Sequence, residues 1–284
     1  MSATPAAPPP TPPPTPPGTA PAGTLTRQRT NPAFLVAWQV RFEQLSFWRN
    51  PVGAIFTVGF SVIFLVLLGA SGANTRVSFL GGIREIQYYV PGFAAYGVMS
   101  ACFNVLALRI VSRRETGLLK RLRLSPLSTW VMLAAIFINS IIVSALQVVL
   151  LLGIGRLAYH VQLPQDYLAL FVTLLVGAVC FCSLGIAAST LVPNEEAAGP
   201  LLGILFYVLL FLSGLYYPLK PGSAVARISG YLPVRHFITA TFAPFDLRPG
   251  VSPWALHDLL VMAIWGVVGV WVAARRFRWE PRRG

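Results

Sequence analysis

The sequence predicts an all-α integral membrane protein with six transmembrane helices. Hydrophobic residues make up 55% of its 284 residues and charged residues only 11%, and the mean hydropathy is +0.67. Several charge-free stretches exceed about 18 residues, the length that crosses roughly 30 Å of hydrocarbon as a helix. The Lys and Arg residues cluster in alternate connections between these stretches, which is typical of multi-pass membrane proteins.

The first 30 residues form a tail rich in Pro, Thr and Ala. This composition cannot bury a core, so we expect residues 1–30 to be disordered. The transmembrane domain is expected at 31–278, followed by a short basic tail at 279–284.

An amphipathic helix is predicted directly after the tail, with Asn31 as its N-cap and Pro32 in its first turn. Aromatic and aliphatic residues then recur every three or four positions, at Phe34, Trp38, Phe42 and Leu45. Such a stripe is typical of a helix that lies in the membrane interface. The alternative is a helix packed on other protein. The run Arg49-Asn50-Pro51 ends it.

Six spans are expected at residues 52–70, 89–108, 130–155, 167–192, 197–218 and 259–274. With this order, fifteen of the 22 Lys and Arg residues fall on the side that holds both termini, and seven fall on the other side. The positive-inside rule therefore predicts cytoplasmic termini. The same distribution accounts for most of the net charge of +13 without a nucleic-acid partner.

The stretch 113–128 (RRETGLLKRLRLSPLS) is unusual because five basic residues lie between two long apolar runs. Read as a helix, it places Leu118 and Leu122 on one face, and Pro126 ends it. A short cytoplasmic helix with an apolar ridge and a basic flank could bind anionic lipid or dock into a groove of a partner protein.

Residues 220–254 are too apolar for a solvated loop and too charged to cross the membrane as a helical pair. We expect an extracytoplasmic re-entrant hairpin of two short helices between spans five and six, separated at Pro233. The alternative is an outer fragment with a small core of its own.

The sequence offers little chemistry. Its two lysines, Lys120 and Lys220, each follow a leucine, so neither completes a phosphate-binding loop, and no cofactor is expected on this chain. The three cysteines lack metal or disulfide spacing. A membrane-embedded enzyme built on Arg235, His236 and Asp246 is an alternative from another class.

Polar residues within the spans are Asn104, Asn139 and Gln147. They either join helices by hydrogen bonds or line a substrate path. The spans have no central Asp or Glu, which argues against a proton-coupled carrier.

The stretch RETGLLKRLRLSPLS resembles the loop between the second and third spans of ABC-2 type permeases, the membrane subunits of ABC exporters. Weaker similarities to the family lie at 49–51, 192–197, 212–219 and 232–236. The resemblance covers about residues 31–278.

The resemblance implies that this loop forms the coupling helix on a separate ATP-binding subunit, which would hold ATP and Mg²⁺. The implied coupling residues are Arg113, Arg114, Glu115, Gly117, Leu118, Leu119, Lys120, Arg121, Glu195 and Glu196. A substrate path would include Asn104, Asn139, Gln147, Ser213 and Tyr216.

The loop is most similar to that of the drug and lipid exporters, which implies export of an amphiphilic substrate across a bacterial plasma membrane. The implied partners are the ATP-binding subunit, a second permease copy or paralogue, and membrane lipid. The alternative is an ATP-independent channel or carrier.

Overall fold

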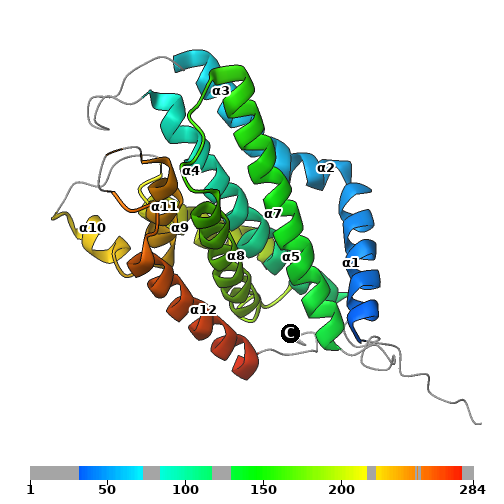
Figure 1. Ribbon diagram of the computed structural model, residues 1–284. Coiled ribbons are helices and arrows are strands. Elements are labelled where there is room, and N and C mark those ends of the chain that lie inside the picture. Colours follow the sequence, from blue (N-terminus) through cyan, green and yellow to red (C-terminus); the bar gives the residue numbers. More distant parts are fainter. Residues whose placement is uncertain are drawn as a thin grey trace, which may run out of the picture. The chain divides into compact units, whose positions relative to one another are not determined.

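A computed structural model describes residues 32–72, 84–116, 129–215, 222–246, 248 and 251–276. It confirms the all-α class and the six predicted spans (Figure 1). The spanning helices are Pro51–Ser71, Glu85–Glu115, Val131–Tyr159, Tyr167–Ser189, Glu195–Leu212 and Leu256–Arg276. The predicted tails at 1–30 and 279–284 lie outside the described residues.

The N-terminal part contains a packed helix followed by a bent first span. Its elements are α1 (Pro32–Trp48), α2 (Pro51–Ala54), the π-helical η1 (Ile55–Gly59) and α3 (Phe60–Gly72). Asn50 separates α1 from α2, because its Oδ1 accepts a hydrogen bond from the Gly53 amide at 3.1 Å and Pro51 occupies the first helical turn. The predicted end of the first helix at 49–51 is therefore confirmed.

The second span is the most buried of the six. It consists of α4 (Glu85–Met99), the π-helical η3 (Ser100–Val105) and α5 (Leu106–Glu115) in one continuous helix. Sequence reasoning ended it at residue 108 and assigned Arg113, Arg114 and Glu115 to a separate short helix. That boundary was wrong, because nothing between 105 and 115 interrupts the helical backbone. The rest of the basic stretch, 117–128, lies outside the described residues.

The later spans are α7 (Thr129–Tyr159), α8 (Tyr167–Ser189), α9 (Glu195–Leu212) and α12 (Leu256–Arg276). The backbones of α8 and η3 approach closely, since a Cβ on Gly185 would lie 2.8 Å from the Phe103 carbonyl oxygen. The fifth span ends at Leu212 rather than at 218, and Gly214 follows it with a φ of +81°, a conformation that favours glycine.

Two short helices precede the last span, as predicted: α10 (Ala224–Ser229) and α11 (Pro233–Phe242), the latter followed by the 3₁₀ turn η4 (Ala243–Phe245). Pro233 lies in the first turn of α11. Phe237 of α11 is fully buried and its ring centroid lies 5.3 Å from that of Phe181 on α8. The side chains of α11 therefore belong to the main core, which disagrees with the alternative of a separate outer fragment.

Two ends of the helical bundle can be distinguished by their hydrogen bonds. At the end that we call the basic end, α5 meets the turn between α8 and α9 through Arg114. At the opposite end, Arg84 donates to the carbonyl oxygens of Tyr159 and His160, and Gln165 donates to the Asp246 carbonyl oxygen.

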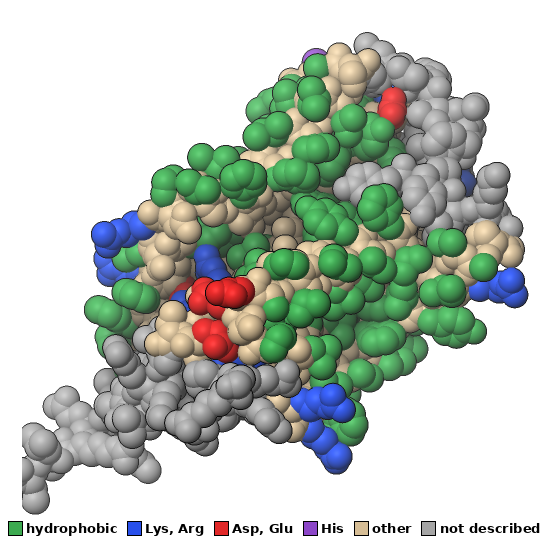
Figure 2. Space-filling model, turned by 180° about the vertical axis from the view of Figure 1, so that it is seen from behind, with side chains coloured by type: hydrophobic (Ala, Val, Ile, Leu, Met, Phe, Trp, Pro, Cys, Tyr) green, Lys and Arg blue, Asp and Glu red, His purple; other side chains and the backbone are tan. Residues whose placement is uncertain are grey.

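The outer surface of the spans is apolar. Figure 2 shows a face on which hydrophobic side chains cover the middle, while charged side chains gather near its edges. Large exposed side chains include Phe56 on η1, Ile204 on α9 and Val267 on α12. An apolar belt of this kind suits contact with lipid tails or with other membrane helices.

Candidate functional site

Arg113 joins the second span to the N-terminal helix. Its Nη2 donates to Glu43 Oε2 at 2.6 Å, and the Glu43 side chain is only 1% exposed. One turn earlier, the Arg109 guanidinium lies 5.1 Å from the centroid of the Phe47 ring. Because a charge this deeply buried needs a partner, the ion pair fixes α1 against the last turns of α5.

Arg114 joins the same helix to a different element. Its Nη2 donates to the Val192 carbonyl oxygen at 2.8 Å and to the Pro193 carbonyl oxygen at 3.3 Å, while Nη1 donates to that of Ser189 at 3.4 Å. These carbonyls form the turn that follows α8, where helical carbonyl groups lack intrahelical partners. The Arg114 cation therefore satisfies the C-terminal end of α8.

A residue that touches a partner subunit is expected to be exposed, whereas Arg114 is buried. It is 5% exposed, and its Nε donates to Glu115 Oε1 at 3.1 Å. The guanidinium donates all of these hydrogen bonds to groups of its own chain. Arg114 would therefore contribute to coupling indirectly, by holding the turn between α8 and α9.

Glu195 and Glu196 begin α9, immediately after this turn, and both are exposed. Asn194 caps the helix by accepting the Ala197 amide at 2.9 Å. Carboxylates in a first helical turn interact favourably with the helix dipole. Both glutamates thus remain available to a partner.

The other expected coupling residues lie outside the described residues. These are Gly117, Leu118, Leu119, Lys120 and Arg121. What the structure shows is their anchorage on one side: the helix that leads into them ends at Glu115, bound to both α1 and the α8–α9 turn.

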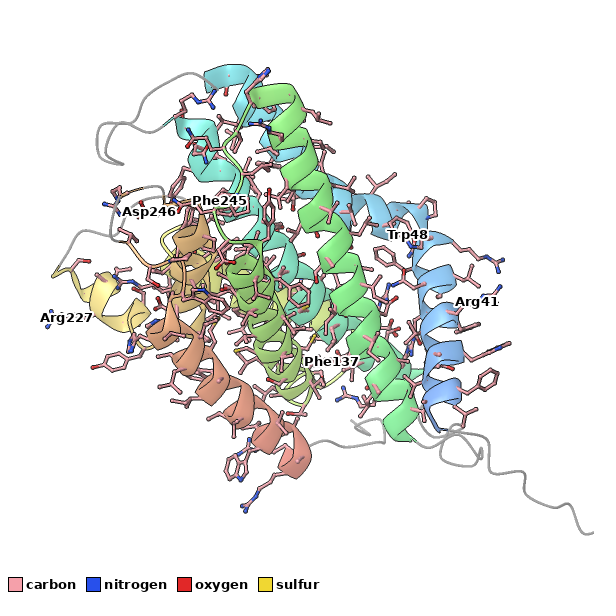
Figure 3. The ribbon with its side chains drawn as sticks, in the orientation of Figure 1. Arg41, Trp48, Phe137, Arg227, Phe245 and Asp246 are labelled. Atoms are coloured by element: carbon pink, nitrogen blue, oxygen red, sulfur yellow. The ribbon has the colours of Figure 1, made fainter. Side chains whose placement is uncertain are left out.

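The α1 helix has two distinct faces. The predicted stripe is exposed, with Phe34 at 59% and Trp38 at 62%, and Arg41 points away from α7 (Figure 3). Glu43 and Phe47 on the other face are buried. Sequence reasoning treated an interfacial stripe and packing on protein as alternatives, whereas α1 combines an exposed aromatic stripe with a buried polar face.

Sequence reasoning missed Glu43 as a functional residue. The available signal was its isolation, since it is the only acidic residue among the first 84, and it lies off the aromatic stripe. An acid that avoids the apolar stripe of a helix must either face water or meet a buried cation, and Arg113 supplies that cation.

The polar residues of the second and third spans lie on η3 (Asn104) and α7 (Asn139 and Gln147). Gln147 is fully buried and its Nε2 donates to Ser61 Oγ at 2.6 Å. Asn139 is 2% exposed. Among the described residues, the side-chain oxygens of Asn104, Asn139 and Gln147 are buried and accept no hydrogen bond. Each such oxygen costs about 1–3 kcal/mol, so the hydrogen bond from Gln147 Nε2 to Ser61 leaves these three oxygens unexplained.

The two remaining candidates for a substrate path differ from these. Ser213 is buried, but its Oγ donates to the Leu210 carbonyl oxygen at 2.5 Å and accepts the Leu215 amide at 3.1 Å. This local pattern ends α9. Tyr216 lies outside the described residues.

The residues of the enzyme alternative do not form one cluster. His236 Nδ1 lies 2.5 Å from Asp258 Oδ1, and its Nε2 lies 2.9 Å from the Gly230 carbonyl oxygen. Arg235 donates to the Ala226 carbonyl oxygen at 2.6 Å. Asp246 instead pairs with exposed Arg248, and the hydrogen bond from Arg248 lowers the pKa of Asp246. The His236–Asp258 contact thus ties α11 to α12, and Asp246 sits apart as a surface ion pair (Figure 3).

The sequence of residues 81–275 matches the ABC-2 family transporter protein family. This match covers more than half of the chain, and it spans α4 through most of α12, including the helix that ends in Arg113 and Arg114. The chain therefore belongs to the ABC-2 family of transporter proteins, and it is a multi-pass membrane protein of the permease type.

Two curated relatives carry the name probable multidrug ABC transporter permease YbhR, from Escherichia coli strain K12 and from Escherichia coli O157:H7. The chain is 24% identical to each over 157 residues, which cover 54% of this chain and 42% of the relative. The match therefore spans less than half the length of these relatives.

Proposed function

We propose that this chain is the permease subunit of an ATP-driven exporter that moves an amphiphilic, drug-like or lipid-like substrate across the plasma membrane. ATP would be hydrolysed by a separate ATP-binding subunit, and both termini of the chain would face the cytoplasm. The YbhR relatives, whose name includes the word multidrug, support an amphiphilic substrate. A second copy or a paralogue would complete the transporter.

The observation that carries this proposal is the pair of neighbouring arginines at the end of α5. Arg113 binds α1 through Glu43, and Arg114 binds the turn between α8 and α9. A force applied to residues 117–128 would therefore act on α5 and, through its two arginines, on α1 and on the turn between α8 and α9. Because packed helices shift between discrete arrangements rather than deforming continuously, such a connection can convert closure of the ATPase into a change of substrate access.

Reversing the charge of two loop residues tests this proposal. Lys120→Glu combined with Arg121→Glu is expected to abolish substrate-stimulated ATPase activity of the assembled transporter, because the loop would then repel acidic groups of the ATP-binding subunit. Arg114 is left unchanged, since its burial would confound coupling with folding. The measurement is ATP hydrolysis in reconstituted vesicles with and without substrate.

The matched control reverses Arg275 and Arg276, two exposed basic residues at the end of α12. This control should keep stimulation, and both double variants should insert in the membrane and elute as folded protein. Full stimulation in the Lys120/Arg121 variant would reject the loop as the coupling element.

The alternative of an ATP-independent channel or carrier makes a different prediction about partners. Affinity purification from native membranes in mild detergent should recover an ABC-type ATP-binding subunit in stoichiometric amount if the exporter proposal holds. Transport by the purified chain alone, without any ATPase, would support the alternative.

A further inference from the structure

We propose that the interface of α4 and η3 with α7 is the substrate site and that it selects amphiphiles that donate hydrogen bonds and carry no negative charge. This inference rests on the proposed function, and it names the chemistry of the substrate. We call the interface the polar seam and define it by Gly97, Asn104, Asn139 and Gln147.

The register of two facing helices brings these residues together. A Cβ on Gly97 would lie 2.5 Å from the Gln147 side chain, so these two positions are in direct contact. One turn further along, Ala101 and Val143 belong to one buried cluster. Asn104 follows Ala101 by three residues on η3, and Asn139 precedes Val143 by four residues on α7, so we place both asparagines further along the same interface.

The buried side-chain atoms of the polar seam that lack a hydrogen-bond partner in the described chain are all acceptors. The side-chain oxygens of Asn104, Asn139 and Gln147 are buried without a donor. The only other buried unpartnered side-chain atom among the described residues is a donor, Nε2 of Gln44 on α1. Native proteins satisfy nearly all buried polar groups, and the exceptions tend to serve a function. Three acceptors at one interface point to a ligand that brings its own donors.

The charged residues near the polar seam restrict the chemical class of the ligand further. No Lys, Arg, Asp or Glu lies between Ile86 and Leu108 or between Thr129 and Gly155. An anionic head group would meet no Lys or Arg from these two segments, and the three unsatisfied oxygens would repel it. An ammonium, amino or hydroxyl group on an apolar body would satisfy the amide oxygens instead.

The polar seam is covered by the N-terminal elements, which suggests how a ligand would enter. Phe47 of α1, Ala54 of α2 and Val58 of η1 belong to the same buried cluster as Ala101 and Val143. The Glu43–Arg113 ion pair holds this cover at the basic end. Displacement of α1 would therefore expose the amide oxygens to the membrane interface.

The test uses two cationic dyes that share one ring skeleton. In a rhodamine methyl ester with unsubstituted amino groups the nitrogens donate hydrogen bonds, whereas in tetramethylrhodamine methyl ester they cannot. Binding is measured by fluorescence anisotropy to the full chain in lipid nanodiscs. We expect the unsubstituted dye to bind about tenfold more tightly, the effect of roughly one hydrogen bond. Fluorescein methyl ester, which is anionic, should bind most weakly.

Asn139→Leu and Gln147→Leu should each abolish the preference between the two rhodamines. Gln162→Leu is the matched control, because Gln162 is exposed at the opposite end, and it should retain the preference. Equal affinity of the unaltered chain for both rhodamines, binding of neither, or a preference that survives both seam variants would overturn the inference. A chain that recruits its ATPase yet fails this test would keep the proposed function and lose only the substrate site.

Discussion

Replacing Arg114 with alanine is expected to lower the free energy of unfolding by about 3 kcal/mol. The substitution removes a cation that is 5% exposed and leaves the carbonyl groups of Ser189, Val192 and Pro193 without their donor. These groups lie within protein, so water replaces the lost bonds poorly. Thermal unfolding in detergent, followed by size-exclusion chromatography with fluorescence detection, measures the loss.

Two further variants separate geometry from charge. Arg114→Lys keeps the cation but lacks the planar fork that reaches several carbonyls, so it should recover only part of the stability. Arg276→Ala removes an exposed arginine from the last turn of α12 and should change the midpoint little. An Arg114→Ala variant as stable as the Arg276→Ala variant would show that the α8–α9 turn does not depend on Arg114.

Breaking the Glu43–Arg113 ion pair from one side is expected to cost about 3 kcal/mol as well, whereas removing both charges should cost much less. Arg113→Leu leaves the Glu43 carboxylate buried with a single hydrogen bond, from Gln39 at 3.2 Å. Arg109 remains as a cation that interacts with this carboxylate. Adding Glu43→Leu removes the buried carboxylate, and apolar replacements of a buried pair are often neutral. Thermal unfolding of the two single variants and of the double variant measures this interaction.

The double variant also separates coupling from stability. If the ion pair transmits motion from the coupling loop to α1, the double variant should fold but lose most substrate-stimulated ATPase activity. Stability losses that simply add in the double variant would mean that the two charges do not interact. A stable double variant with full stimulation would mean that α1 takes no part in coupling.

The sequence predicted the parts of the fold that follow from local physics. Uninterrupted apolar stretches gave six spans because the length of a membrane helix is set by the bilayer. Arg49-Asn50-Pro51 and Pro233 marked helix boundaries because proline interrupts a helix interior. These signals act within a few residues, so no knowledge of packing was needed.

Prediction from the sequence failed where contacts between distant residues determine the structure. It separated Arg113 and Arg114 from the second span because the charge-free run ends at Leu108, yet buried partners on other elements keep this stretch within the folded core. The partners of Arg114 are backbone carbonyls, which no residue pattern reveals. Likewise, the pairing of His236 on α11 with Asp258 on α12 joins residues 22 positions apart in the sequence, and it has no sequence signature.

The polar seam shows a third case. The sequence identifies Asn104, Asn139 and Gln147 as polar residues within spans, and it is compatible with helix joining or with a substrate path. Only the packing distinguishes the oxygens that lack a donor from the Gln147 nitrogen that is bonded to Ser61. Which polar groups a fold satisfies depends on helix register, and the sequence does not report register between helices.

The central claim is that residues 117–128 lie on the cytoplasmic side, where an ATP-binding subunit can reach them. The direct test labels a single cysteine at Ser125 with a membrane-impermeant maleimide, and Cys102, Cys180 and Cys182 are buried and should not interfere. Ser71→Cys, at the exposed opposite end of α3, serves as the outward control. The account predicts that Ser125→Cys reacts only in inverted vesicles and Ser71→Cys in intact cells. Reaction of Ser125→Cys in intact cells would contradict it.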